Sequence, residues 1–198
     1  VRALAVMIFT PITAALASRG AIDVRLSTAI GFVLLGVSNW ILAGVTTSDS
    51  QFSTFIVSLI ISGIGLSQIF VPLSIAVIGG VPDREVPATS AFFNLSRQIG
   101  GSIATAVLVT LLVRGISTHQ TELAASVNLH RAPTAIYLQH NGGQHSVSAL
   151  INLEGMVEAQ AAVLSYADTS RWTAIITILL APLVLLLNKP RLGAAVVE

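Results

Sequence analysis

The chain has 198 residues, of which 54% are hydrophobic and only 10% are charged, and its net charge is +1. Ordinary soluble domains contain about 25% charged residues, so this chain lacks the side chains to cover a water-facing surface. The small net charge excludes the basic surface typical of nucleic-acid-binding proteins. The chain contains no Cys, which excludes disulfides and thiolate metal sites.

Five stretches that are nearly free of charge follow one another along the chain. Most approach or exceed the ~20 residues that cross a bilayer as a helix. Lipid offers no hydrogen-bond partners, so apolar runs of this length satisfy their backbones internally as helices. The sequence therefore predicts an all-α transmembrane fold with five membrane helices, at about 3–18, 26–45, 52–79, 86–113 and 172–187.

The positive charges between these stretches predict the orientation. Cytoplasmic connections carry an excess of Arg and Lys. The segment 46–51 holds only Asp49, and the segment 114–171 is too long to weigh in orientation. We therefore expect 114–171 to be extracytoplasmic and 188–198 to be a cytoplasmic tail. The cytoplasmic side would then contain Arg19, Arg25, Arg84, Lys189 and Arg191.

The extracytoplasmic segment divides into two parts. Pro133 and Asn141-Gly142-Gly143 are expected to interrupt any helix there, whereas apolar residues from about 146 recur at spacings of three or four and predict an amphipathic helix. The segment's histidines lack the spacing of a helical zinc site, so we expect solvated loop residues and no metal. They are His119, His130, His140 and His145.

The stretch 86–113 contains one charge, Arg97, in the middle of a predicted membrane helix. An Arg at this depth costs roughly 2.5–3.5 kcal/mol on insertion scales. One interpretation is that Arg97 lines a hydrated path and pairs with a substrate, a carboxylate or a carbonyl. The alternative is a structural charge that snorkels to the interface or clamps two helices. On a helical wheel of this stretch, Arg97 lies within an arc of about 140° that holds polar and small residues, and the arc opposite it is apolar. The polar arc holds Ser90, Asn94, Arg97, Gln98, Gly101, Ser102 and Thr105, and the apolar arc holds Phe92, Leu95, Ile99, Ile103 and Ala106.

Small residues and one proline mark the helix predicted at 52–79. Gly63 and Gly65 suit close helix contacts, and Pro72 should bend the helix one turn after the polar Gln68. A bend beside a polar side chain suits a cavity wall, although many helical bundles contain one. We interpret the pair Gly100-Gly101 as a packing or flexible point rather than a ligand contact.

The segment 63–107, GIGLSQIFVPLSIAVIGGVPDREVPATSAFFNLSRQIGGSIATAV, resembles EmrB/QacA-type drug:proton antiporters of the major facilitator superfamily. That family's pattern here is QGLGxGFxFxPLxxxxxxxLPPExxxxxxxLxNxxRxxGxSIG. Further family-like residues follow in the same order. The coinciding residues are Pro72, Leu73, Ser74, Pro82, Glu85, Asn94, Arg97, Gly100, Ser102 and Ile103, then His119, Leu123, Val127, Asn128, Gln160, Ala161, Tyr166 and Asp168.

The resemblance implies the last five of fourteen helices, a partial C-terminal six-helix bundle. It implies proton-coupled efflux of small, often lipophilic compounds by alternating access across the bacterial cytoplasmic (inner) membrane. The expected partners are the substrate, protons, the lipid bilayer, the N-terminal half of the same protein and a periplasmic adaptor, with no cofactor. Asp23 and Arg25 resemble a cytoplasmic gating motif, whose preceding Gly-Arg is replaced here by Leu16-Ala17. The candidate transport-pathway residues are Arg97, Asn94, Gln98, Ser90, Gln68 and Arg2.

Two other functions stay open at the level of sequence. One is a non-transporting membrane anchor or interaction protein from a truncated gene, and the other is a transporter of a specific metabolite with the same fold. An enzyme is not expected, because the chain has no GxSxG, no Walker-type loop and no GxGxxG after a strand. The resemblance implies that the membrane carboxylates of proton coupling lie largely in the N-terminal half.

Overall fold

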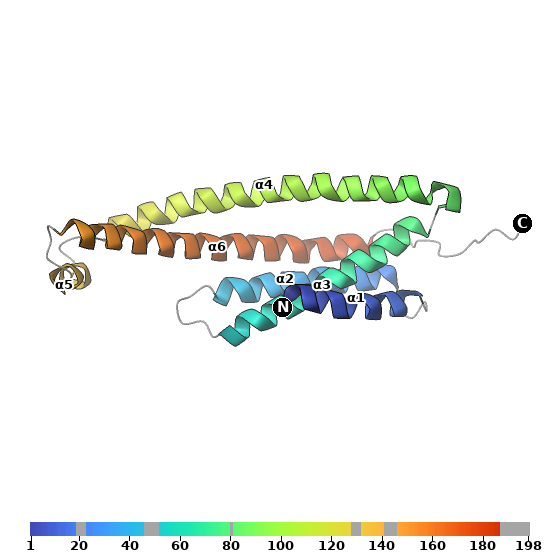
Figure 1. Ribbon diagram of the computed structural model, residues 1–198, viewed down its shortest axis with the longest axis horizontal. Helices are drawn as coiled ribbons and strands as arrows, with labels where there is room; N and C mark the ends of the chain where they lie inside the picture. Colours follow the sequence, from blue (N-terminus) through green and yellow to red (C-terminus); the bar gives the residue numbers. More distant parts are fainter. Residues whose placement is uncertain (19–22, 46–51, 80, 128–131, 141–145, 187–198) are drawn as a thin grey trace, which may run out of the picture. The chain divides into compact units, whose positions relative to one another are not determined.

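The computed structural model describes residues 1–18, 23–45, 52–79, 81–127, 132–140 and 146–186. Within these residues the chain is all-helical (Figure 1). Four of its helices are long and apolar enough to cross a membrane, by their length and composition. The elements are α1 (Arg2–Ser18), α2 (Val24–Val45), α3 (Phe52–Ile78), the 3-10 turn η1 (Asp83–Glu85), α4 (Val86–Ser126), α5 (Ala132–His140) and α6 (Val147–Leu185).

The four candidate spans lie in α2, α3, α4 and α6, and α1 is shorter than each of them. With 17 residues, α1 rises about 25 Å, which is less than the ~30 Å hydrocarbon core of a typical bilayer. It contains Pro11, which has no N–H to donate within the helix. A fifth span at α1 therefore remains a prediction.

Helices α4 and α6 extend beyond the membrane boundaries predicted for them. α4 has 41 residues and continues past Val113 to Ser126. α6 has 39 residues and joins the amphipathic helix expected from about 146 to the span expected at 172–187. Residues 114–126 contain no Pro and one Gly, and residues 164–173 contain neither. The sequence around both predicted boundaries therefore contains no residue that would end a helix there.

The expectation that Pro133 interrupts a helix was wrong. Pro133 is the second residue of α5, in the first turn, where a backbone N–H has no partner inside the helix. The other expected breakers, Asn141-Gly142-Gly143, lie outside the described residues.

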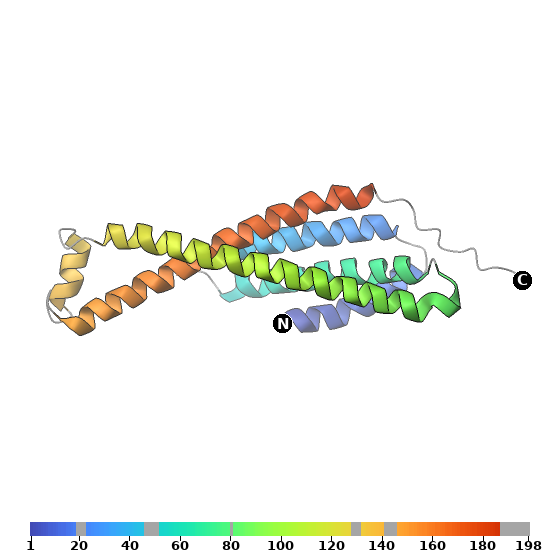
Figure 2. The ribbon, with the colours of Figure 1, turned by 90° about the horizontal axis from the view of Figure 1, so that it is seen from above.

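The chain forms two compact units. Unit 1 comprises residues 1–104 and 170–198, and unit 2 comprises residues 105–169. In unit 1, the last part of α6 lies beside α2, α2 beside α3, and α3 beside α1 (Figure 2). A Cβ added to Gly36 on α2 would clash with Ile178 on α6, and one added to Gly63 on α3 would be 2.6 Å from the Cβ of Ala5 on α1.

The contact between α2 and α3 is more extensive than that between α1 and α3. A Cβ at Gly31 would lie 2.8 Å from the carbonyl oxygen of Gly65, and a Cβ at Gly65 would lie 2.9 Å from that of Gly31. Toward one end, the hydroxyls of Ser38 and Ser58 each donate to the other residue's carbonyl, at 2.8 Å in both directions. Toward the other end, Ser27 donates to the side-chain oxygen of Gln68. The two helices are therefore antiparallel, with small residues at the point of closest approach.

Unit 2 is a helical hairpin. The part of α4 from Thr105 and the part of α6 before Ser170 run antiparallel, and the Ser165 hydroxyl on α6 donates to the carbonyl of Leu112 on α4 at 2.6 Å. Gly115 leaves room for Ser165, because a Cβ at Gly115 would clash with the Ser165 hydroxyl. Helix α5 belongs to the same unit, and its Leu138 is fully buried.

We predict that Gly65→Ala destabilises the protein by about 1–3 kcal/mol, because the added methyl group overpacks the α2–α3 contact. Unfolding in SDS titrations of the protein in mild detergent measures this. The matched control is Gly44→Ala, at a glycine of α2 whose Cβ would meet nothing within 4 Å. Equal stability of the two variants would contradict the packing described for α2 and α3.

Candidate functional site

The candidate pathway surface is the polar arc of α4 in unit 1. The chain enters α4 through η1, where the N–H of Glu85 donates to the carbonyl of Pro82 at 2.8 Å. Pro87 follows in the first turn, where it costs no helix hydrogen bond. The helix then runs without a proline, so residues at spacings of three and four share a face.

Arg97 lies on this surface and contacts an aromatic ring of the neighbouring helix α3. Its Cζ is 5.6 Å from the centroid of the Phe70 ring, within the range of a cation–π contact. Its Nη2 is 3.5 Å from the side-chain oxygen of Asn94, one turn earlier. Among the described residues, no carboxylate lies within ion-pair distance of Arg97. The guanidinium therefore faces an aromatic ring and a neutral amide.

Both faces of α4 are exposed within the chain. Arg97, Asn94 and Gln98 are exposed on the polar arc, and Ser90 is half-buried. On the opposite arc Phe92 is 71% exposed, and none of the residues of α4 is buried. An apolar face of this kind suits lipid or a packing partner, whereas the polar face requires water, protein or a ligand.

Open space surrounds the two glycines that follow Arg97. A Cβ at Gly100 or at Gly101 would meet no described atom within 4 Å. Gly101 is one turn beyond Arg97 and on the polar arc. The close helix packing predicted for these glycines has no counterpart among the described residues.

Gln68 and Arg97 are not brought together. The Gln68 side chain accepts a hydrogen bond from Ser27 and thus faces α2. Phe70, two residues further along α3, is rotated about 200° from Gln68 around the helix and faces Arg97. The polar group and the aromatic ring therefore lie on opposite sides of α3.

Pro72 is buried in α3, which continues on both sides of it. Without an N–H, Pro72 leaves the carbonyl of Gln68 without its usual helix partner. Gly63 and Gly65 precede this point and contact α1 and α2 at close range. The predicted small residues thus contact α1 and α2, and the predicted bend at Pro72 stays a prediction.

The remaining predicted site residues lie at helix ends. Arg2 is exposed at the start of α1, and its carbonyl oxygen would be 2.9 Å from a Cβ at Gly63. Asp23 caps α2, because its carboxylate accepts the backbone N–H of Arg25 at 3.3 Å. The Nε of Arg25 is buried without a hydrogen-bond partner among the described residues. Asp23 thus has a local structural function at the start of α2, and its gating function stays a prediction.

Two contacts of unit 1 were missed from the sequence. Phe70 is one apolar residue among many in α3, and nothing in its spacing singles it out. The reciprocal pair of Ser38 and Ser58 could have been suspected, because serines in apolar helices often bond across a helix interface. Its register, however, depends on how α2 and α3 pack.

His119 is not the solvated loop residue that was expected. Because α4 continues past Val113, His119 lies on a helix, where its Nε2 is 2.9 Å from Asp168 Oδ2 on α6 and its Nδ1 is 3.5 Å from Glu122 Oε2. Its side chain is 22% exposed. His140 is exposed at the end of α5, and His130 and His145 lie outside the described residues. Among the described residues, no group of three potential ligands could hold a metal ion.

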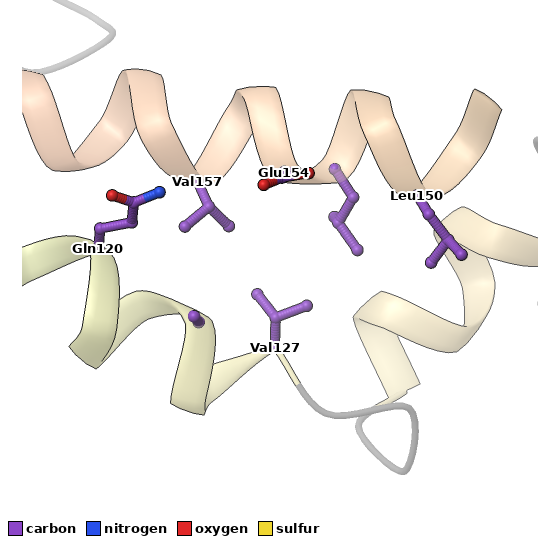
Figure 3. A pocket seen from close by; sticks show the side chains of 7 residues that line it. Gln120, Val127, Leu150, Glu154 and Val157 are labelled. Atoms are coloured by element: carbon purple, nitrogen blue, oxygen red, sulfur yellow. The ribbon is translucent and has the colours of Figure 1, made fainter. Parts of the chain in front are cut away.

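A small open pocket lies between the two helices of unit 2, and Figure 3 shows that side chains from both of them line it. Its lining is mainly apolar, with the amide of Gln120 and the carboxylate of Glu154 as polar groups. None of the residues predicted for the transport pathway lines this pocket. The lining residues are Gln120, Ala124, Val127, Leu150, Leu153, Glu154 and Val157.

An all-helical chain with four helices long and apolar enough to cross a membrane has the features of a multi-pass membrane protein. No family model matches the chain. The "Probable multidrug resistance protein EmrY" of Escherichia coli K12 is 26% identical over 173 residues, which cover 85% of this chain and 33% of that protein.

Two further relatives point the same way. The "Multidrug export protein EmrB" of Escherichia coli K12 is 26% identical over 137 residues, covering 69% of this chain and 26% of EmrB. The "Uncharacterized MFS-type transporter YcnB" of Bacillus subtilis 168 is 28% identical over 111 residues, covering 56% of this chain and 22% of YcnB. The chain is thus a distant homologue of EmrB- and EmrY-type multidrug exporters of the major facilitator superfamily. It spans 22% to 33% of the length of these three relatives.

The His119–Asp168 contact should couple α4 to α6 measurably. In a double-mutant cycle of His119→Gln and Asp168→Asn, we expect a coupling free energy of about 0.5–1.5 kcal/mol in unfolding titrations, the net value of one hydrogen bond. Coupling of His119 to Glu122 should be smaller, because Glu122 is 68% exposed and lies on the same helix. His140→Gln is the control, since His140 bonds only a carbonyl of its own helix among the described contacts. A coupling energy of zero between His119 and Asp168 would show that the contact contributes nothing.

Proposed function

We propose that the chain is the C-terminal part of a proton-coupled multidrug exporter. In this proposal it crosses the bacterial cytoplasmic membrane with five helices and moves small, often lipophilic compounds outward by alternating access. The observation that carries the proposal is the distant similarity to EmrY over 85% of the chain. The relatives described above are named as exporters, resistance proteins or transporters, and none is named as an enzyme.

The polar arc of α4 supports this function. A transport path needs a membrane helix that presents polar groups on one side while its other side contacts lipid or protein. The arc containing Arg97, Asn94 and Gln98 is exposed, and so is the apolar arc opposite it. In the proposal, the polar arc faces a central cavity that the N-terminal half of the protein completes.

The other helices of unit 1 pack closely together beside the helix that carries this arc. α3 contacts α1 and α2 through glycines and serines, and it presents Phe70 to Arg97. In alternating access such a bundle moves as one body relative to the other half. The same proposal places protons and a periplasmic adaptor among the partners, and it places proton-binding carboxylates in the N-terminal half.

We predict that Arg97→Ala in the full-length protein reduces dye efflux at least tenfold while the protein still inserts, because the transport path loses its charge. Arg97→Lys should recover only part of the efflux, since an ammonium lacks the planar fork of the guanidinium. Efflux is measured in cells and normalised to folded protein in the membrane. Phe92→Ala, on the exposed apolar arc, is the matched control and should retain efflux.

A second comparison separates transport from structural clamping. If Arg97 only joined α4 to α3 through the Phe70 ring, then Phe70→Leu would reproduce the defect of Arg97→Ala. The proposed function requires the defect of Arg97→Ala to be clearly the larger one. Normal efflux by Arg97→Ala would refute a transport function for this residue.

A further inference from the structure

The charges of the helices in unit 1 have a single sign. Within the described ranges, the parts of α1, α2, α3, α4 and α6 that belong to unit 1 contain no Asp or Glu. Acidic residues flank these parts: Asp23 precedes α2, Asp83 and Glu85 belong to η1, and Asp168 precedes the unit 1 part of α6. The charged residues of these helical parts are Arg2, Arg25, Arg97 and Arg171.

Arg2 and Arg25 lie in the first turns of α1 and α2, whereas Arg97 and Arg171 lie in the interiors of α4 and α6. The described contacts of Arg97 are the Phe70 ring at 5.6 Å and the Asn94 side-chain oxygen at 3.5 Å. A guanidinium carries five N–H donors, so these contacts leave most of its hydrogen-bonding capacity unused. An intramembrane cation without an anionic partner is costly, and a bound anion would offset that cost.

The surroundings of Arg97 also have room and suitable chemistry for a ligand. Gly101 lies one turn further on the same arc, with open space where a side chain would be. Phe70 is 39% exposed and offers an aromatic surface beside the charge, and Gln98 offers an exposed amide. A charge next to an apolar ring and an open backbone suits a molecule with a negative head group and an apolar body.

We propose that the Arg97 surface binds amphiphilic anions, such as carboxylates or sulfonates that carry an aromatic or aliphatic body, in preference to lipophilic cations. Arg97 supplies the charge and two parallel N–H donors, and Phe70 and the open backbone at Gly101 accommodate the apolar body. This inference rests on the proposed function in one respect, because the bound anion is taken to be the exported compound. A cation of equal size would meet only like charge on the described helical parts of unit 1, and low-dielectric surroundings strengthen that repulsion.

The test uses two naphthalene derivatives with the same apolar body and opposite head groups, a 2-sulfonate and a 2-trimethylammonium. Binding to the purified full-length protein is measured by calorimetry, and transport by proteoliposomes under an imposed pH gradient. Wild type should prefer the sulfonate. Arg97→Gln should weaken sulfonate binding about 10- to 100-fold, which is the scale of one hydrogen-bonded charge. Arg84→Gln, the same charge change in the exposed turn η1, is the matched control and should bind the sulfonate as wild type does.

Two further variants separate charge from shape. Arg97→Glu should reverse the preference toward the trimethylammonium compound, which mere loss of structure would not do. Gly101→Leu should weaken sulfonate binding by filling the open space, whereas Gly100→Leu, which also meets no described atom but lies outside the polar arc, should not.

The outcomes distinguish this inference from the proposed function. Sulfonate binding that depends on Arg97, without transport of either compound, would support the inference and contradict the exporter proposal. Transport of both compounds with equal affinity, or sulfonate binding unchanged in Arg97→Gln, would overturn the inference and leave the exporter proposal standing.

Discussion

The close approach of α2 and α3 is the constraint on which the rest of unit 1 depends. At Gly31 and Gly65 each helix backbone lies where a side chain of the other would otherwise be. Only at this separation can Ser38 and Ser58 bond each other's carbonyls. Helices in lipid gain little from burying apolar surface against each other, so such packing and hydrogen bonding supply the association energy. α3 is thereby fixed along its length, and with it the position of Phe70.

Because α3 is fixed, Arg97 has a defined neighbour in the Phe70 ring, which does not neutralise the charge of the guanidinium. The Phe70 ring attracts the guanidinium through its electron-rich face, a contact worth about 0.5–2 kcal/mol, which is less than a well-formed intramembrane ion pair would supply. The cation is thus positioned, but it has no anionic partner among the described residues. A structural clamp would be expected to pair the charge with a carboxylate, whereas a site for a transient ligand benefits from leaving it available. This difference favours a transport function over an anchoring function for α4.

Periodicity and composition were sufficient to predict the all-helical fold and four of the five expected spans as long apolar helices, because these follow from the chain's own spacing. They were insufficient wherever two helices meet. Phe70 beside Arg97 depends on packing between α3 and α4, and His119 beside Asp168 depends on the hairpin of unit 2. The lengths of α4 and α6 were underestimated because a change from apolar to polar sequence ends a membrane span, but it does not end a helix.

The claim that the polar arc of α4 faces water is central to this account, and a cysteine scan of α4 tests it most directly. The chain contains no cysteine of its own, so single cysteines between Ser90 and Thr105 report on one position each. In the full-length protein, freed of any other cysteine and held in membranes, reaction with a small polar thiol reagent should recur every three to four residues. The maxima should fall at Ser90, Asn94 and Gly101, and the minima at Leu95, Ile99 and Ile103. Uniform reactivity, or maxima on the apolar arc, would contradict the account.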